Sequence, residues 1–249
     1  MKKNLLLAAG VSVLSLSAQA EQFWADNSFS LLYGDNYKMV PEGESTKATV
    51  MTLEHVSGHS WGGMFFFIDR VNSGEGAYDE TYGELSPSIS LAKFDGFVKG
   101  INAAFTYEFS TSKTETAPFT FDTFSQDNYL VGVGVDLAIP GMDYFSATVY
   151  RSQNNNNFGK FYDNQLTLVY GWSMGNVTLD GYLDYTPGRN GRISELSIAP
   201  QLTYNIGPVL GLKNKVKVGI EYSYWHNKFA IDVPKNDQHN ASLLLKWHL

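Results

Sequence analysis

Long runs of alternating apolar and polar residues constrain this chain more than any other feature of its sequence. Successive side chains of a β-strand point to opposite faces, so a strand with one apolar face shows a period of two. The clearest runs lie at 101–109, 129–139 and 196–206. Each has about ten residues, longer than the usual soluble strand and long enough for a tilted strand to cross a bilayer.

Weaker runs with the same alternation fill most of the remaining chain. They lie at 28–39, 47–56, 62–71, 82–93, 143–152, 162–174, 177–186, 216–226 and 239–249. With the three clear runs they make twelve strands, an even number, as in bacterial single-chain barrels. The sequence therefore predicts an all-β fold, a transmembrane antiparallel up-and-down β-barrel of twelve strands.

The first residues predict export. Lys2 and Lys3 precede an apolar stretch at 5–16, and Ala18-Gln19-Ala20 then forms an A-x-A cleavage pattern. The stretch is shorter than the roughly 20 residues of a membrane-spanning helix, and no long apolar segment follows it. We assign 1–20 to a signal peptide and 21–249 to a barrel in the outer membrane of a Gram-negative cell.

The connections between the runs fit a barrel whose two ends both face the periplasm. Such a barrel has long outer loops and short inner turns. The expected outer loops are 40–46, 72–81, 110–126, 153–161, 187–193 and 227–238, and the inner turns include 57–61, 140–142 and 175–176. Residues 207–215 are longer than an inner turn needs. Pro200, inside a clean strand, predicts a bulge because it lacks an N–H group.

The last strand of the chain carries a further signal. Residues 239–249 place Ala241, Leu243, Leu245, Trp247 and Leu249 on one face, and the chain ends there. This segment resembles the C-terminal assembly signal of outer-membrane barrels, which usually ends in phenylalanine. The last strand of a secreted β-sandwich is the alternative.

If the apolar faces meet lipid, the opposite faces line the lumen. They carry Glu54, Glu84, Glu108, Asp136, Asp180, Asp184, Glu195 and Glu221 against Lys217 and Lys246. Such a lumen repels anions and admits neutral or cationic solutes. Aromatic residues on the same faces are Phe65, Phe67, Tyr144, Tyr150, Tyr182 and Trp225. A flat solute could stack on these rings, with about 1–3 kcal/mol per base, while its hydroxyls bond the carboxylates; nucleosides fit, and sugars and aromatic acids remain open.

Two segments also resemble a known family. The motifs are Thr52-Leu53-Glu54-His55, Ser57-Gly58, Trp61-Gly62, Phe65-Phe66-Phe67 and Asp69, and then the pattern at 129–136, 139–141 and Tyr150. They resemble the nucleoside-specific channel-forming porins, the Tsx-like and OmpK-like family. The resemblance implies a twelve-stranded barrel with a narrow channel for nucleosides, no cofactor, and outer loops that also serve phage as receptors. Glu54 and Asp69 are the site residues that the motif carries, and alternation adds Phe67, Tyr182, Glu221 and Trp225.

Other classes of function are weaker. The formal net charge of −7 argues against a nucleic-acid partner, and the absence of cysteine excludes disulfides and thiol chemistry. No G-x-S-x-G or H-E-x-x-H motif is present, so we expect no enzyme, no catalytic residues and no metal site. The alternatives to a channel are a plugged barrel acting as a surface interaction protein or phage receptor, and a hydrolase with a Ser or Asp beside His226. Expected partners are outer-membrane lipid and lipopolysaccharide. Arg189 and Arg192 could bind lipopolysaccharide phosphates, but a solvated loop is the favoured interpretation of these two residues.

Overall fold

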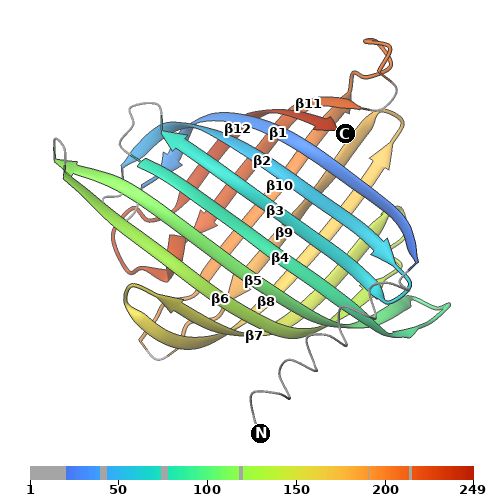
Figure 1. Cartoon of the computed structure of the whole chain (residues 1–249), viewed down its shortest axis with the longest axis horizontal. Helices are drawn as coiled ribbons and strands as arrows, with labels where there is room; N and C mark the ends of the chain where they lie inside the picture. Colours follow the sequence, from blue (N-terminus) through green and yellow to red (C-terminus); the bar gives the residue numbers. More distant parts are fainter. Residues whose placement is uncertain (1–20, 40–43, 74–77, 118–119, 190, 213–214) are drawn as a thin grey trace, which may run out of the picture.

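The computed structural model describes residues 21–39, 44–73, 78–117, 120–189, 191–212 and 215–249. Within these ranges the chain forms twelve strands and a short 3₁₀-helix, η1 (Figure 1). Their bounds are β1 (Gln22–Lys38), β2 (Ser45–His59), β3 (Gly62–Ser73), β4 (Tyr78–Lys93), β5 (Val98–Ala117), β6 (Thr120–Leu137), β7 (Tyr144–Asn156), β8 (Gly159–Met174), β9 (Val177–Thr186), β10 (Glu195–Asn205), β11 (Val216–His226), η1 (Lys228–Ala230) and β12 (Gln238–His248). The predicted signal peptide lies outside the described residues. No helix in the described part of the chain is long and apolar enough to cross a membrane.

The strands close into a single barrel. Each strand pairs antiparallel with its neighbours in the sequence, and β1 pairs with β12. The strands run obliquely across the barrel (Figure 1), as closure of a sheet requires. Every one of the twelve predicted segments is a strand, so the predicted fold class is confirmed.

The two faces of the sheet differ as the alternation predicts. In β12 the side chains of Asn240, Ser242, Leu244 and Lys246 are buried inside the barrel, and those between them are exposed on its outer surface. Exposed apolar side chains recur around that outer surface, among them Leu53, Ile89, Val131, Val133, Val149, Leu202, Ile220 and Leu243. A closed barrel with an apolar outer band and a polar interior has the surface of a bilayer-spanning protein.

The connections alternate between the two ends of the barrel. Glu21 and Leu249 lie at one end, here the terminal end, where the backbone N–H groups of Ser60 and Leu249 donate to the carbonyls of Glu21 and Asn27. The opposite, distal end carries the connection between β9 and β10, described at 187–189 and 191–194, and the connection 227–237 between β11 and β12. At the terminal end, residues 206–212 form a series of turns before β11, in agreement with a connection longer than a tight turn.

The strands extend further than predicted at the distal end. Much of 110–126, expected to be a loop, belongs to the hairpin of β5 and β6, whose register continues from Ser110↔Gln126 to Ala117↔Thr120. The ladder continues there although the apolar alternation stops, because neither face of this part of the hairpin has an apolar environment to match. Alternation therefore marks the apolar band and not the ends of the strands.

The prediction of a bulge at Pro200 is wrong. Pro200 pairs in register with Gly181 of β9, and the register with β11 is the same on both sides of it. The ladder to β11 is interrupted between Ile198 and Gln201, and the one to β5 breaks in the same way at Pro87 of β4. The missing N–H group is accommodated by a gap in the ladder, and no residue is inserted.

Side chains complete the seam between β1 and β12. Backbone pairing runs only from Ser28↔His248 to Tyr33↔Leu243. Beyond it, Asn240 Oδ1 accepts from the backbone N–H of Asn36 at 3.1 Å, and Gln238 Oε1 accepts from that of Lys38 at 2.9 Å. Gly34 leaves room for this arrangement, because a Cβ atom there would lie 2.6 Å from Asn240 Oδ1.

Candidate solute-binding lumen

All the carboxylates expected in the lumen lie on inward faces. The β12 side chains fix the inward direction, and the strand registers carry it around the barrel. Glu54 is in register with Phe67, Phe67 with Glu84, and Glu84 with Glu108, so these residues share the inward face of four strands. Inward carboxylates that the sequence analysis did not name are Asp26, Glu80 and Asp163.

Aromatic rings and carboxylates meet in one part of the lumen, here called the lumenal cluster: Phe67, Tyr82, Glu84, Glu108, Tyr182 and Asp184. The Phe67 and Tyr82 ring centroids are 5.7 Å apart, and the Tyr82 hydroxyl donates to Glu84 Oε1 at 2.6 Å. Tyr182 and Asp184 belong to β9, and Glu84 of β4 interacts electrostatically with both of them. The lumenal cluster therefore combines residues from two separate walls of the barrel, β4 and β9.

The carboxylates of the lumenal cluster are held by neutral donors from the barrel wall. Asn128 Nδ2 donates to Glu108 at 2.9 Å. Thr167 Oγ1 and Gln165 Nε2 donate to Asp184 at 2.5 and 3.1 Å. Because these donors are uncharged, they orient the carboxyl groups and supply no positive charge to the cluster.

Glu54 and Asp69, the two residues of the family-like motif, are both inward but differ in their partners. Glu54 accepts from Lys246 Nζ at 3.0 Å and from Ser28 Oγ at 3.3 Å. Asp69 accepts from Thr52 Oγ1 at 2.5 Å and interacts electrostatically with Glu54 and Glu221. Glu54 thus forms an ion pair, whereas Asp69 is bonded to a hydroxyl.

Glu221 and Tyr182 lie near Glu54 and Asp69, and Trp225 does not. Glu221 accepts from Gln201 Nε2 at 2.8 Å and acts electrostatically on Tyr182. Trp225 lies at the distal end, where its Nε1 donates to Glu195 Oε1 at 2.6 Å and its ring packs edge-on against Phe229. Of the six predicted site residues, Glu54, Asp69, Glu221 and Tyr182 are thus linked electrostatically, and Phe67 is in register with Glu54. Trp225 lies apart from them, under the 227–237 loop.

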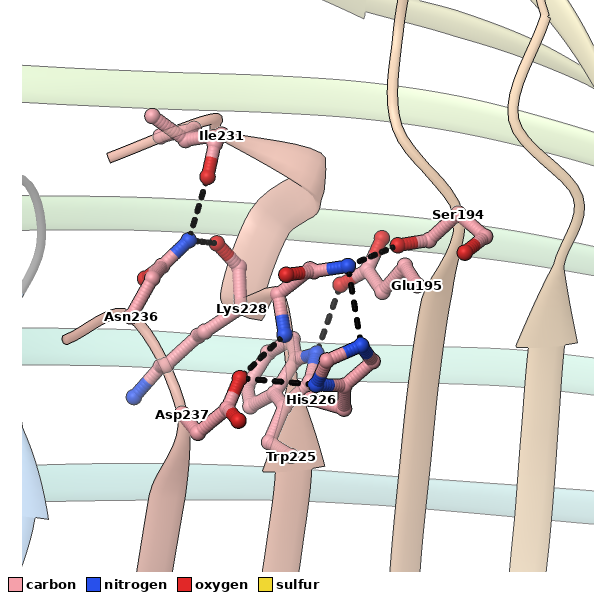
Figure 2. A network of polar contacts seen from close by, with 9 residues as sticks. Ser194, Glu195, Trp225, His226, Lys228, Ile231, Asn236 and Asp237 are labelled. Atoms are coloured by element: carbon pink, nitrogen blue, oxygen red, sulfur yellow. Dashed lines mark hydrogen bonds and ion pairs between the residues drawn. The ribbon is translucent and has the colours of Figure 1, made fainter. Parts of the chain in front are cut away.

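The 227–237 loop is fixed to the barrel rather than free (Figure 2). Asn236 Nδ2 donates to the carbonyls of Lys228 and Ile231, and the backbone N–H of Phe229 donates to Glu195. Lys228 Nζ donates to Lys38 O at 3.0 Å and to Gln238 Oε1 at 2.9 Å, which ties the loop to the β1–β12 seam. Sequence reasoning missed this arrangement, because its partners are up to 190 residues apart.

Two titratable groups of this loop are shifted. Burial lowers the pKa of the Lys228 amine to about 8, although Glu80 and Glu195 act in the opposite direction. Burial also acts to raise the pKa of Asp237, but hydrogen bonds from the Asn227 N–H and from His226 outweigh it, and the pKa is lowered. Asp237 is therefore the ionised partner of His226.

A hydrolase at His226 would need a Ser or Asp beside this ring, and the structure supplies only part of such a site. Asp237 Oδ1 lies 2.9 Å from His226 Nδ1 (Figure 2), so an acidic partner is present. The other ring nitrogen, Nε2, contacts the amide of Asn227 at 3.1 Å. A nucleophilic mechanism also needs a hydroxyl or thiol at the base, and no described contact of His226 supplies one.

A serine does meet two other histidines, which sequence reasoning overlooked. His55, Ser57 and His59 share the outward face of β2, and both His55 Nε2 and His59 Nε2 lie 2.9 Å from Ser57 Oγ. His55 Nδ1 lies 2.8 Å from Asn27 Oδ1 on β1. A spacing of two residues brings side chains together on a strand, a point that the search for helical motifs missed. Ser57 is only 2% exposed, so its hydroxyl is closed off beneath the two rings.

Comparisons with known proteins give structural similarity only. No protein-family model and no curated protein matches the chain. The chain is similar to a KdgM porin (11% identity, TM-score 0.47, covering 90% of this chain and 98% of that one) and to a NanC porin (10%, 0.48, 89% and 99%). It is also similar to the translocator domain of autotransporter NalP from Neisseria meningitidis (10%, 0.43, 99% and 96%). Similarities this distant assign neither a family nor a solute, so the functional conclusion depends on the geometry of the barrel itself.

Proposed function

We propose that the chain is a passive channel of a Gram-negative outer membrane, selective for nucleosides or similar small neutral solutes. The lumenal cluster carries the proposal, because it combines flat rings with carboxylates that accept hydrogen bonds. Phe67, Tyr82 and Tyr182 offer ring faces to a base, and Glu84 and Asp184 offer acceptors to the hydroxyls of a sugar. A neutral solute with both kinds of group matches this wall.

The membrane placement rests on the outer surface of the barrel. Exposed tyrosines and tryptophans lie on outward faces towards the strand ends, among them Tyr162, Tyr204, Tyr222 and Trp247. Such rings prefer the headgroup level of a bilayer. The apolar side chains between these levels would be poorly placed in water and well placed in lipid.

The charge of the lumen supports a neutral or cationic solute. The inward carboxylates outnumber Lys217 and Lys246, and the donors around the lumenal cluster are uncharged. A narrow lumen lined by more acidic than basic side chains repels anions such as nucleotides. The resemblance of residues 52–69 and 129–150 to nucleoside-specific porins points to the same solutes.

Single-channel current in a planar bilayer tests the proposal. The purified barrel should conduct, and adenosine or thymidine should block the current in a saturable way. Nucleoside 5′-monophosphates should block less because of their charge. Current that nucleosides do not change would keep the barrel and remove this solute class.

The variant Phe67→Leu tests the role of the ring, and Phe66→Leu is its matched control. Both changes replace one phenylalanine on β3, but Phe67 faces the lumen and Phe66 the outer surface. Phe67→Leu should weaken nucleoside block about tenfold, the equivalent of the 1–3 kcal/mol of one stacking contact. Phe66→Leu should leave block unchanged. The double variant Glu54→Ala with Asp69→Ala should weaken selectivity while the barrel still assembles.

A surface interaction protein is the second candidate, and the shape of the distal end favours it. The β5–β6 hairpin is built from the two longest strands and projects well beyond the neighbouring connections (Figure 1). Near its tip, Lys113 Nζ lies 3.5 Å from the centre of the exposed Phe121 ring. A barrel that inserts into the bilayer but passes no current would favour this function, with phage as one class of partner.

A further inference from the structure

An arginine-lined cavity opens at the distal rim of the barrel, where inward and outward side chains of β8 meet. It has a volume of about 280 Å³ and is lined by Arg151, Phe161, Tyr162, Asp163, Arg189 and Arg192. β7 and β8 supply the first four residues, and the 187–194 connection supplies the last two. Arg151 and Tyr162 lie on outward faces, since their neighbours Ser152 and Asp163 are buried inside the barrel.

Neighbouring residues show where this cavity lies relative to the bilayer. Along the outward face of β7, the residues Phe145, Ala147 and Val149 are apolar and Arg151 is the first charged one. Tyr129 of β6 and Tyr162 of β8, both exposed, are each in register with Gln153, one outward position further along β7. An apolar band that ends at a charged residue between tyrosines marks the headgroup level of a bilayer.

Two of the arginines are held in place by aromatic rings. Arg192 Cζ lies 3.9 Å from the Phe161 ring centre, and Arg151 Cζ lies 5.4 Å from that of Tyr162. Arg151 Nη1 also donates to Asn164 Oδ1 at 3.1 Å. Stacking orients a guanidinium group and leaves most of its N–H donors available to a ligand.

The positive charge of the cavity is only partly compensated. Asp163 lies 3.7 Å from Arg192 Nε, a long ion pair, and Arg189 makes none among the described residues. Three arginines less one aspartate leave a formal charge of +2. A phosphate group carries about −1.5 to −2 at neutral pH, and the guanidinium fork matches its oxygens.

We propose that this cavity binds a phosphate group of lipopolysaccharide in the outer leaflet. The inference rests on the outer-membrane placement in the proposed function but not on the solute. The acidic lumen repels anions, so an anion site at the rim, with Arg151 on the outward face at the headgroup level, serves lipid contact rather than transport. The bound phosphate would connect β7, β8 and the 187–194 connection to the surrounding lipid.

Lipid binding to the purified, folded barrel tests the site, with native mass spectrometry as the readout. Three probes distinguish the sources of phosphate: lipid A with its phosphates, lipid A without them, and inorganic phosphate. The barrel should prefer phosphorylated lipid A by about tenfold or more, as charge-assisted bonds require. Inorganic phosphate should not compete at millimolar concentration. Effective competition would instead identify a free-anion site and overturn the assignment to lipid.

The double variant Arg151→Gln with Arg189→Gln should lose this preference for phosphorylated lipid A. Arg70→Gln is the matched control, since Arg70 is also outward but is paired with Asp79 at 3.3 Å. A preference that survives in the double variant, or is absent from the wild type, refutes the site. The same preparations are also tested for block of the channel current by nucleosides. If nucleosides do not block the wild type, only the proposed solute is wrong. If the protein does not insert into bilayers, the membrane placement is wrong.

Discussion

The ion pair between Lys246 and Glu54 should stabilise the barrel by an amount that a double-mutant cycle can measure. It joins β12 to β2 across the inward face of β1, with Nζ and Oε1 3.0 Å apart. Lys246→Met removes the cation and keeps most of the apolar stem, and Glu54→Gln removes the charge of the acid at constant shape.

The exposure of the two side chains sets the size of the effect. Breaking a fully buried pair costs about 3–5 kcal/mol, whereas a surface pair contributes about 0–1 kcal/mol. The Lys246 side chain is 8% exposed and that of Glu54 is 24% exposed, which places the pair between these limits. We expect Lys246→Met to lower the free energy of unfolding by about 2–3 kcal/mol, because it removes the ion-pair partner of Glu54 and leaves Lys217 as the remaining lysine near Glu54 and Asp180.

Glu54→Gln should cost less, about 1–2 kcal/mol, because Asp180 still compensates Lys246. The double variant should be more stable than the sum of the two single effects predicts, with a coupling of about 1 kcal/mol or more. Urea unfolding of the barrel in lipid vesicles, followed by tryptophan fluorescence, gives these free energies.

Lys99→Met is the control, since Lys99 is exposed near the terminal end of β5 and should contribute little. Lys246→Met should also make the channel more cation-selective, which shifts the reversal potential in a salt gradient. If the losses in unfolding free energy of the two single variants add up to that of the double variant within about 0.3–0.5 kcal/mol, the pairing is refuted.

Three further predictions concern the ends and the outer surface of the barrel. Leu249→Asp should reduce the yield of heat-modifiable barrel in the outer membrane and Leu249→Phe should not, because the Leu249 side chain is exposed on the apolar surface; normal yield for Leu249→Asp would contradict this. Between pH 8 and about 10.5 the unfolded chain keeps a proton on Lys228 that the folded chain has lost. The free energy of unfolding of the wild type, relative to that of Lys228→Met, should therefore rise with pH in that window. A difference between the two proteins that does not change with pH would exclude the lowered pKa. Wild type and Ser57→Ala should hydrolyse phospholipid and p-nitrophenyl esters equally slowly, because the Ser57 hydroxyl is enclosed; a faster wild type would establish an esterase.

The fold is predictable from the sequence because a closed antiparallel ladder allows each strand only one register that keeps its apolar residues outside. A shift of one residue in β10 would turn Leu202 and Tyr204 inward and Thr203 outward. The same constraint makes the inward direction of Glu54, Glu84 and Glu221 predictable from alternation alone. It does not determine the strand ends, since β5 and β6 continue where neither of their faces meets lipid.

The partners of the lumen residues are not predictable from the sequence. Lys246 and Glu54 are 192 positions apart, and Lys228 and Lys38 are 190 apart. Period and composition give the face of a side chain, but its axial and angular neighbours depend on how the tilted sheet closes. The bonds of Ser57 to His55 and His59 are local, and a search by strand spacing could have found them.

The structure changes the order in which the six lumen candidates should be tested. The resemblance places Glu54 and Asp69 first, but Lys246 already neutralises Glu54 and Thr52 already occupies an oxygen of Asp69. Tyr182 is 40% exposed, and it lies beside Asp184, whose donors are uncharged, on a separate wall of the barrel from Phe67 and Tyr82. A solute gains most from groups whose own wall has not saturated them, since displacing an internal bond offsets the new one. We therefore expect Phe67 and Tyr182 to control nucleoside affinity, and Glu54 to control mainly the stability of the seam and the charge of the lumen.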